Sequence, residues 1–356
     1  MRWGAMLMCA AALLPLAAAP HALADDTELC RISDKRLTEI SGLAYSPTHE
    51  GIIWTHNDSG GGPKLYALDA NSCQTLAVLT LRGVPAKDIE AMAAGVNVLG
   101  ERVLWVADIG DNTAARSTVS IYEVREPREL RSTTVNVTRY ALKYSTPQDA
   151  EALMADPRVD QLWIVSKGLL GGSVFAVPRP MWPRGVTSVR KVGEEAGFVT
   201  DAAIAPDGTR YAVRDYREAR IYRGQPPGEL ITSVELPAQV QGEAVTWTPD
   251  GRALIVASES DDRLLRVDLP PETWMKSASV DESTAPEPAE TVETNVVNAA
   301  VVPADRMGTL AVVALAAGGG VFVLACLVVV IVLAVVSVAT LLWRRRQRAL
   351  ADTATD

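Results

Sequence analysis

Residues 201–223 read DAAIAPDGTRYAVRDYREARIYR, a stretch of three short strands separated by two turns. Residues 201–205 and 211–213 flank the turn Pro-Asp-Gly at 206–208, in which proline presets φ and glycine accepts a positive φ. A third strand at residues 220–222 follows a polar loop. Short strands joined by tight turns pair as neighbours, so this stretch predicts an antiparallel sheet.

The same order of strands occurs five times along the chain. Each repeat opens with a polar or acidic residue, a small residue and a short apolar strand, at residues 41–45, 90–94, 151–155, 201–205 and 243–247. The openings are 49, 61, 50 and 42 residues apart. Four strands per repeat without helical periodicity are typical of a β-propeller blade. We therefore predict an all-β, five-bladed propeller over residues 25–275; the alternative, six blades, needs another blade inside the 61-residue interval.

The two ends of the chain are apolar and differ from the repeats. Residues 1–24 combine Arg2, an apolar run and the small-residue pattern Ala22-Leu23-Ala24, which predicts a signal peptide. Residues 309–343 include 23 consecutive uncharged residues, enough to cross the hydrocarbon layer, and predict a transmembrane helix region. The arginines of residues 344–356 place this basic tail in the cytoplasm. Residues 276–308, rich in Ser, Thr, Pro and Glu, predict a disordered acidic stalk.

This organisation predicts a single-pass protein of the cell membrane, with the propeller outside and the C-terminus in the cytoplasm. Of the four cysteines, Cys9 falls in the signal peptide and Cys326 in the membrane segment. Cys30 and Cys73 remain in the oxidising compartment, where we expect them to form a disulfide. The last repeat lacks a fourth strand, and an unused strand at residues 28–33 precedes the first repeat. We expect that strand to close the ring, which leaves no edge unpaired.

The net charge limits the classes of partner. The chain is 48% hydrophobic and 22% charged with a net charge of −9, which excludes overall disorder. Between the signal peptide and the tail it holds 29 basic and 41 acidic residues, a net charge of −12. Nucleic-acid binding requires basic patches that displace phosphate counterions, so we expect no nucleic-acid partner. An acidic exterior favours solubility or the binding of cations.

Acidic residues recur where the first strand of each blade enters the central channel. Four carboxylates, with Ser41 in the fifth position, are expected to surround one end of it: Glu90, Glu151, Asp201 and Glu243. Converging carboxylates cannot all ionise unless a cation or basic groups compensate them. They are therefore candidate ligands of Ca²⁺ or Mg²⁺, which prefer hard oxygen donors. The alternative is a structural salt-bridge network in which Lys167 and Arg214 neutralise the ring.

The loops after the second strands are polar and should lie on the same face. With Ser41 they supply the candidate ligand-binding residues His56, Asn57, Asp58, Asp108, Asp111, Asn112, Lys167, Arg214 and Glu259. For Asp108 and Asp111, Asx-turns that cap the loop are an equally plain interpretation. Trp54, Trp105 and Trp163 recur at one position of the second strand, which favours packing between blades over a sugar-stacking surface.

Two of these loops resemble a known group of proteins. His56-Asn57-Asp58-Ser59-Gly60 and Ala107-Asp108-Ile109-Gly110-Asp111-Asn112 with Arg116 resemble bacterial secreted propellers that carry a GDIGDN motif, akin to phytase-like and NHL-like propellers. Further residues share this resemblance: Ala150-Glu151-Ala152-Leu153, Lys167 and Arg214. The resemblance covers about residues 36–270. Ala107 replaces the first glycine of the motif, and Lys87-Asp88-Ile89-Glu90 replaces a more acidic run.

The sequence therefore supports three functions. The first is a propeller that binds a small ligand, a divalent cation or a surface partner at the acidic end of its channel. The second, implied by the phytase-like resemblance, is a Ca²⁺-dependent hydrolase of phosphoesters, esters or lactones. Its candidate general bases are Glu151 and Glu243, and Lys167 and Arg214 would stabilise developing negative charge. The third is a structural module that docks another protein of the cell envelope.

Overall fold

The computed structural model describes residues 26–169 and 171–274. The predicted signal peptide (1–24), stalk (276–308), transmembrane region (309–343) and basic tail (344–356) lie outside the described residues. Among residues 26–169 and 171–274 there is no helix long and apolar enough to cross a membrane. The described chain is all-β apart from one short 3₁₀ helix, η1 (Pro271–Thr273).

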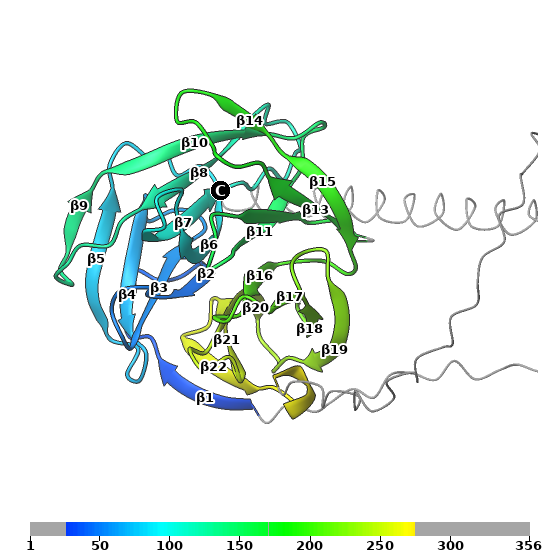
Figure 1. The fold of residues 1–356 in the computed structure, drawn as a ribbon. Coiled ribbons are helices and arrows are strands. Elements are labelled where there is room, and N and C mark those ends of the chain that lie inside the picture. Colours follow the sequence, from blue (N-terminus) through cyan, green and yellow to red (C-terminus); the bar gives the residue numbers. More distant parts are fainter. Residues whose placement is uncertain (1–25, 170, 275–356) are drawn as a thin grey trace, which may run out of the picture. The chain divides into compact units, whose positions relative to one another are not determined.

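Five sheets surround a common centre, and each sheet is one blade (Figure 1). Blade 1 contains β2 (Ile40–Tyr45), β3 (Ile52–Asn57), β4 (Lys64–Asp69) and β5 (Thr75–Leu81). Blade 2 contains β6 (Ile89–Val96), β7 (Arg102–Asp108), β8 (Val119–Val124) and β10 (Val137–Lys143). Blade 3 contains β11 (Ala150–Ala155), β12 (Leu162–Ser166), β13 (Gly172–Val177) and β15 (Arg190–Glu195). Blade 4 contains β16 (Asp201–Ile204), β17 (Arg210–Arg214), β18 (Glu218–Arg223) and β19 (Glu229–Glu235). Blade 5 contains β20 (Gln241–Trp247), β21 (Ala253–Glu259), β22 (Arg263–Asp268) and the N-terminal strand β1 (Asp26–Arg31).

The predicted five-bladed propeller is confirmed, and so is its closure by the N-terminal strand. β1 pairs antiparallel with β22 and forms the outer strand of blade 5. Each innermost strand contacts the innermost strands of the two adjacent blades, including β20 against β2 where the ring closes. Residues 26–274 therefore hold every strand of the ring and belong to a single compact unit, which we expect to fold on its own.

Two further strands, which the sequence pattern did not predict, cover outer edges. β9 (Thr133–Val135) leaves blade 2 and pairs parallel with β5 of blade 1. β14 (Val186–Ser188) leaves blade 3 and pairs parallel with β10 of blade 2. The detour through β9 occupies part of the 61-residue interval, so that interval holds no sixth blade. Both strands protect an outer edge that would otherwise present unpaired backbone groups.

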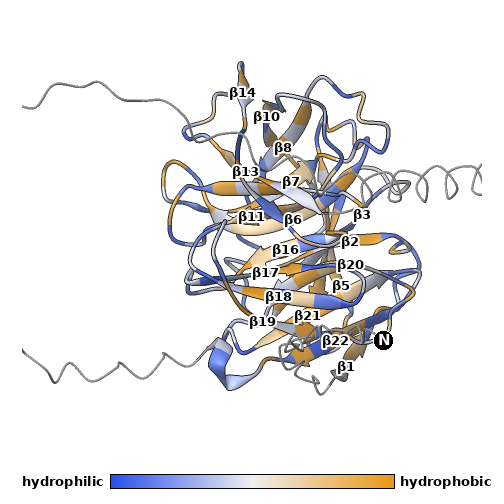
Figure 2. Cartoon of the chain, turned by 90° about the vertical axis from the view of Figure 1, so that its right-hand side faces the viewer, coloured by the Kyte–Doolittle hydropathy of each residue, from blue (hydrophilic) through white to orange (hydrophobic). Residues whose placement is uncertain are grey.

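The hydrophobic core is divided into five clusters, one between each pair of adjacent blades. Trp54 packs between blades 1 and 2 and Trp105 between blades 2 and 3, both with no exposed surface. Trp163 occupies the corresponding place between blades 3 and 4. The predicted role of these tryptophans in packing between blades is confirmed. In a side view the apolar residues concentrate on the strands (Figure 2).

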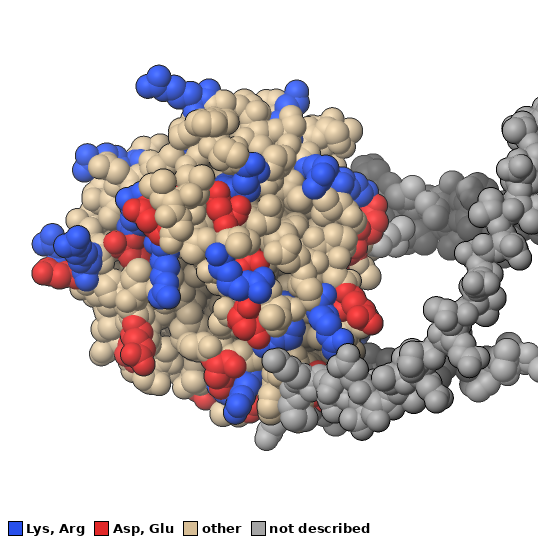
Figure 3. Space-filling view, viewed as in Figure 1, with Lys and Arg blue, Asp and Glu red and all other residues tan. Residues whose placement is uncertain are grey.

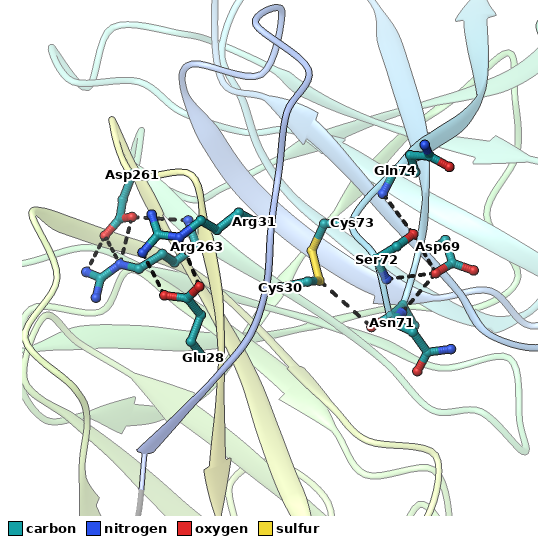
Figure 4. The surroundings of a disulfide bond; sticks show 11 residues. Glu28, Cys30, Arg31, Asp69, Asn71, Ser72, Cys73, Gln74, Asp261 and Arg263 are labelled. Atoms are coloured by element: carbon teal, nitrogen blue, oxygen red, sulfur yellow. Dashed lines mark hydrogen bonds and ion pairs between the residues drawn. A yellow bond between two sulfur atoms is a disulfide. The ribbon is translucent and has the colours of Figure 1, made fainter.

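The predicted disulfide is present, and it joins the closing strand to blade 1. Cys30 on β1 is bonded to Cys73, which lies in the turn between β4 and β5 (Figure 4). The Cys73 side chain is fully buried. Arg31 on the same strand pairs with Glu28 and with Asp262 of blade 5, although all three side chains are exposed. Exposed ion pairs contribute little to the stability of a fold. The disulfide is the covalent link between the closing strand and blade 1.

Replacing both cysteines by serine is expected to lower the free energy of unfolding by about 3–4 kcal/mol. The disulfide closes a loop with a sequence separation of 43 residues, and constraining a loop of that length in the unfolded chain gives a stabilisation of about this size. Urea denaturation of residues 25–275 measures the loss. Reduction of the native fragment is the control and should give the same value. A loss below about 1 kcal/mol in both would contradict the prediction.

Antiparallel pairing gives the channel two chemically different ends. We call the end at which β2, β6, β11, β16 and β20 begin the acidic end, and the end at which they finish the turn end. The loops between second and third strands also lie at the acidic end. On the face of the ring shown in Figure 3, basic and acidic side chains are interspersed. Charge of one sign is concentrated instead in the buried carboxylates at the acidic end of the channel.

Candidate functional site

The predicted ring residues lie at the acidic end, each at or near the start of an innermost strand. Ser41, Glu90, Glu151, Asp201 and Glu243 are all at most 5% exposed. Burial of carboxylates at this density demands compensation, because desolvation disfavours the ionised form. The four blades that carry these carboxylates differ in how far they provide that compensation.

Four of these five residues occupy β-bulges. In blade 1 the pairing passes from Ile40 to Gly42, which leaves Ser41 as the extra residue. The same shift isolates Glu90 in β6, Glu151 in β11 and Glu243 in β20. A bulge releases one residue from the regular alternation of side chains and re-aims it. The repeated bulge therefore explains how every blade except blade 4 can present a polar side chain beside an otherwise apolar strand.

Asp201 in blade 4 has no bulge and is bound by the protein backbone. Its two carboxylate oxygens accept hydrogen bonds from the amides of Val245 and Ala202, both at 2.8 Å. The side chain is fully buried, and this burial raises its pKa well above the usual value. Asp201 therefore connects blades 4 and 5 through the Val245 amide.

Arg214 lies beside Asp201 and is also fully buried. Its guanidinium donates to the carbonyl oxygen of Ala244 at 3.0 Å and to Oε1 of Gln239 at 3.1 Å. Burial lowers its pKa to about 10, against the opposing effect of the Asp201 carboxylate. These contacts join blade 4 to blade 5, but their acceptors are a carbonyl and an amide oxygen rather than the carboxylates of the predicted salt-bridge network.

Glu151 in blade 3 is neutralised by a lysine. Its Oε1 lies 2.6 Å from Nζ of Lys167, which also lies 5.0 Å from the centre of the Phe198 ring. Burial raises the pKa of Glu151 to about 7, and Lys167 partly offsets that rise. This ion pair is largely buried, since the Lys167 side chain is 18% exposed and that of Glu151 only 3%.

Glu243 in blade 5 is only half satisfied. Its Oε1 accepts hydrogen bonds from the Tyr216 hydroxyl at 3.2 Å and from Nε2 of Gln241 at 3.0 Å. Its Oε2 is buried and has no hydrogen-bond partner among the residues that the structure describes. The Tyr216 ring stacks on Phe198 with centroids 5.7 Å apart, which continues the cluster toward Lys167.

Glu90 in blade 2 belongs to a compact cluster of three carboxylates. One oxygen each of Asp58, Asp88 and Glu90 lie within 4.8 Å of one another. Burial and the neighbouring Glu151 raise the pKa of Glu90 to about 10, and burial and Asp88 raise that of Asp58 to about 7. Oδ1 of Asp58 is buried without a hydrogen-bond partner in the described part of the chain. The nearest neutral donor to Glu90 is the Ser41 hydroxyl, 3.3 Å from its Oε2.

The glycine of the Ala107–Asn112 motif allows the loop to cover this cluster. A Cβ atom at Gly110 would lie 2.3 Å from Oε1 of Glu90 and 2.5 Å from the Asp88 carboxylate. Any larger residue would have to displace the carboxylates. The physical requirement for glycine at this position is therefore close approach to the acidic cluster.

The other polar residues of the motif hold the loop itself. Asp108 pairs with Arg116 at 2.5 Å and accepts the Lys87 amide at 3.1 Å. Asp111 accepts the Arg116 amide at 2.6 Å, whereas Asn112 is exposed. Both aspartates thus hold the loop, but these contacts are not Asx-turns, because the amides they bind are at Lys87 and Arg116 rather than two residues further along the chain.

The remaining candidates lie around the cluster. His56 is buried; its Nδ1 is 3.1 Å from the carbonyl oxygen of Asn57 and its Nε2 has no partner within the described ranges. The Asn57 side chain donates to the Arg36 carbonyl at 2.7 Å, which fixes the loop before β2. Glu259 is half-buried, and burial and Glu243 raise its pKa. Its carboxylate therefore adds to the negative field at the acidic end.

Asp88 is the site residue that sequence reasoning did not assign. It stands two residues before Glu90, on the approach to β6. A count of one acidic residue per blade does not reveal Asp88, because its carboxylate converges on Glu90 of its own blade and on Asp58 of the preceding blade. The signal that could have identified it is the pair of acidic residues flanking Ile89 at the start of the bulged strand.

Comparison with known proteins gives no assignment: no protein-family model matches the chain, and no curated protein matches it. The fold and the geometry thus define a five-bladed propeller with buried carboxylates at one end of its channel. Any functional conclusion has to come from these residues.

Proposed function

We propose that the propeller binds a divalent cation, Ca²⁺, through Asp58, Asp88 and Glu90 at the acidic end of its channel. The observation that carries the proposal is the convergence of three carboxylates within 4.8 Å, one of them with a buried oxygen that lacks a hydrogen-bond partner within the described residues. Glu151 is paired with Lys167 and Asp201 accepts two backbone amides, whereas the three carboxylates of the cluster form no ion pair among the described residues; Lys167 and Arg116 act on Glu90 and Asp88 only from a distance. The proposal replaces the four-carboxylate set expected from the sequence with a smaller one.

The chemistry of the cluster suits a hard cation. Ca²⁺ takes about six to eight oxygen ligands, of which carboxylates are the commonest charged type. Three side chains provide only part of that number. Asp58 and Asp88 are half-buried, so the remaining positions would be accessible to water or to an oxygen of a small anionic ligand. In this proposal residues 309–343 anchor the ring outside the cell, as the sequence predicts.

Melting curves of residues 25–275 in Ca²⁺ and in EDTA test the proposal. A ligand that binds only the folded ring stabilises it by about 2.7 kcal/mol at a hundred times its Kd, so Ca²⁺ should raise Tm by several degrees. Asp88→Asn should abolish the difference. Glu229→Gln, which removes one exposed carboxylate on β19, is the matched control and should keep it. Equal melting curves for the native ring in Ca²⁺ and EDTA would refute the proposal.

The stabilisation by Ca²⁺ is expected to grow between pH 5 and pH 8. The raised pKa values of Asp58, about 7, and Glu90, about 10, mean that protons compete with the cation for these oxygens. Between the ordinary carboxyl pKa and these raised values, the cation-free folded ring binds more protons than the unfolded chain. Its stability therefore falls as the pH rises through this range. The negative charges of Asp88, Glu151 and Glu259 also contribute to the raised pKa values of Asp58 and Glu90. Melting curves at four pH values measure the gap between Ca²⁺ and EDTA; a constant gap would contradict the prediction.

A second candidate function, hydrolysis at the same end of the channel, is favoured by the Glu151–Lys167 pair. A carboxylate whose pKa is near 7 is suited to act as a general base at neutral pH, and Lys167 supplies a positive charge beside it. Turnover of a chromogenic phosphoester, an ester and a lactone by the full chain tests this function. Activity that Glu151→Gln removes and Glu229→Gln retains would establish it, and absence of turnover on all three would leave cation binding alone.

A further inference from the structure

The turn end of the channel, opposite the carboxylates, contains a cavity of about 500 Å³. Its walls come from the final residues of the innermost strands and the turns that follow them. The apolar side chains among them include Leu43, Met92, Ala94, Ala203, Ile204 and Trp247. Pockets for small molecules typically enclose about 300–1,000 Å³ and are lined mainly by apolar groups. The volume and the lining both fall in that class.

Small side chains create this space. Ala44 in blade 1, Ala94 in blade 2, Ala155 in blade 3 and Ala203 in blade 4 all line the cavity. Elsewhere, between the blades, large side chains such as Trp54 and Trp105 fill the interior completely. Protein interiors pack densely and leave few voids larger than a water molecule. The alanines thus maintain an open space in four adjacent blades.

The polar groups near this cavity are already bound to each other. Glu126 accepts hydrogen bonds from the Ser46 hydroxyl at 2.6 Å, from the Thr48 hydroxyl and from the Trp54 indole. Nε2 of His49 lies 2.9 Å from the carbonyl oxygen of Pro127. These polar groups at the rim therefore already have hydrogen-bond partners within the protein.

The charged residues that line the cavity bear on the charge of its ligand. They are Glu50 and Arg102, both exposed, and Arg102 donates to the Pro47 carbonyl at 2.9 Å. Their charges are opposite and lie at the solvent side. An ionic ligand would therefore lose its hydration without gaining a dedicated counter-charge, whereas a neutral one would lose little.

We propose that the turn end of the channel is a second binding site, which takes a neutral, hydrocarbon-rich small molecule. Burial of its apolar surface against the alanines, Met92, Ile204 and Trp247 provides the affinity, and Thr246, which also lines the cavity, offers one hydroxyl for orientation. The site is separate from the carboxylate cluster, so its occupation does not depend on the proposed cation.

A fluorescence titration of residues 25–275 with the neutral probe N-phenylnaphthylamine tests the proposal. We expect one saturable site per chain, unchanged in EDTA. Ala94→Phe fills the cavity and should weaken binding by at least about tenfold, whereas Ala141→Phe, at a half-buried position on β10 outside the cavity, should not. Anilinonaphthalene sulfonate has the same ring system with an added negative charge and should bind at least about tenfold more weakly.

Circular dichroism and melting curves confirm that each variant is folded. If Ala94→Phe does not fold, Ala203→Leu reduces the same cavity with a smaller change and is expected to weaken binding in the same direction. Absence of saturable binding by the native ring would overturn the proposal. So would binding that is unaffected in a folded Ala94→Phe or Ala203→Leu variant. Equal affinity for the sulfonated probe would overturn the neutral ligand class.

Discussion

Replacing Arg214 by methionine is expected to lower the free energy of unfolding of the ring by about 3–5 kcal/mol. The substitution removes a fully buried positive charge close to Asp201, and each buried acceptor that it leaves without a donor costs about 1–3 kcal/mol. It also removes the hydrogen bonds to the Ala244 carbonyl and to Gln239, which join blade 4 to blade 5. Urea denaturation of residues 25–275 measures the change.

Arg266→Met is the matched control for this substitution. Arg266 forms an ion pair with Asp268 at 2.7 Å, but both side chains are at least 33% exposed. An exposed pair contributes between zero and about 1 kcal/mol, so the control should retain nearly full stability. If the Arg214 variant were as stable as the control, Arg214 would not be structural, and its predicted role toward a ligand would regain support.

Glu90→Gln is expected to change stability in opposite directions with and without Ca²⁺. In EDTA at pH 7 the variant should be more stable than the native ring by on the order of 1–3 kcal/mol, because the native carboxyl has to take up a proton to fold and glutamine does not. In Ca²⁺ the native ring should be the more stable of the two, because only it retains all three proposed ligands.

Denaturant titrations in both media measure the two differences, with Glu229→Gln as the control that should behave as the native ring does. The reversal of order distinguishes a cation site from a merely strained cluster. A strained cluster would make the variant more stable in both media. A Glu90→Gln variant that still responds to Ca²⁺ would exclude Glu90 from the site.

Much of the fold follows from local sequence patterns. The repeated opening of each blade predicts the blade number, and the strand left over before the first repeat predicts the closure; the two cysteines that remain between the apolar ends predict the disulfide. β9 and β14 escape prediction because they are three residues long and depend on pairing with another blade. Non-local pairing of this kind has no period that a single sequence displays.

The candidate site was predictable in residue type but less so in arrangement. One polar or acidic residue per blade indicates the acidic end, yet the direction of each side chain depends on bulges at Ser41, Glu90, Glu151 and Glu243 that no sequence pattern marks. For the same reason Asp88 was not assigned. The burial of Arg214 depends on how blades 4 and 5 pack, which the order of residues does not encode locally.

The closing strand has a consequence for biosynthesis. β1 is the first part of the ring to be made, but its partner β22 follows four further blades later. The growing chain therefore carries an unpaired strand throughout most of its synthesis, when such strands are prone to incorrect association. Both cysteines of the disulfide precede blade 2, so oxidation can tether β1 to blade 1 long before blade 5 exists. A disulfide formed at that stage would keep β1 beside blade 1 until β22 is available to pair with it.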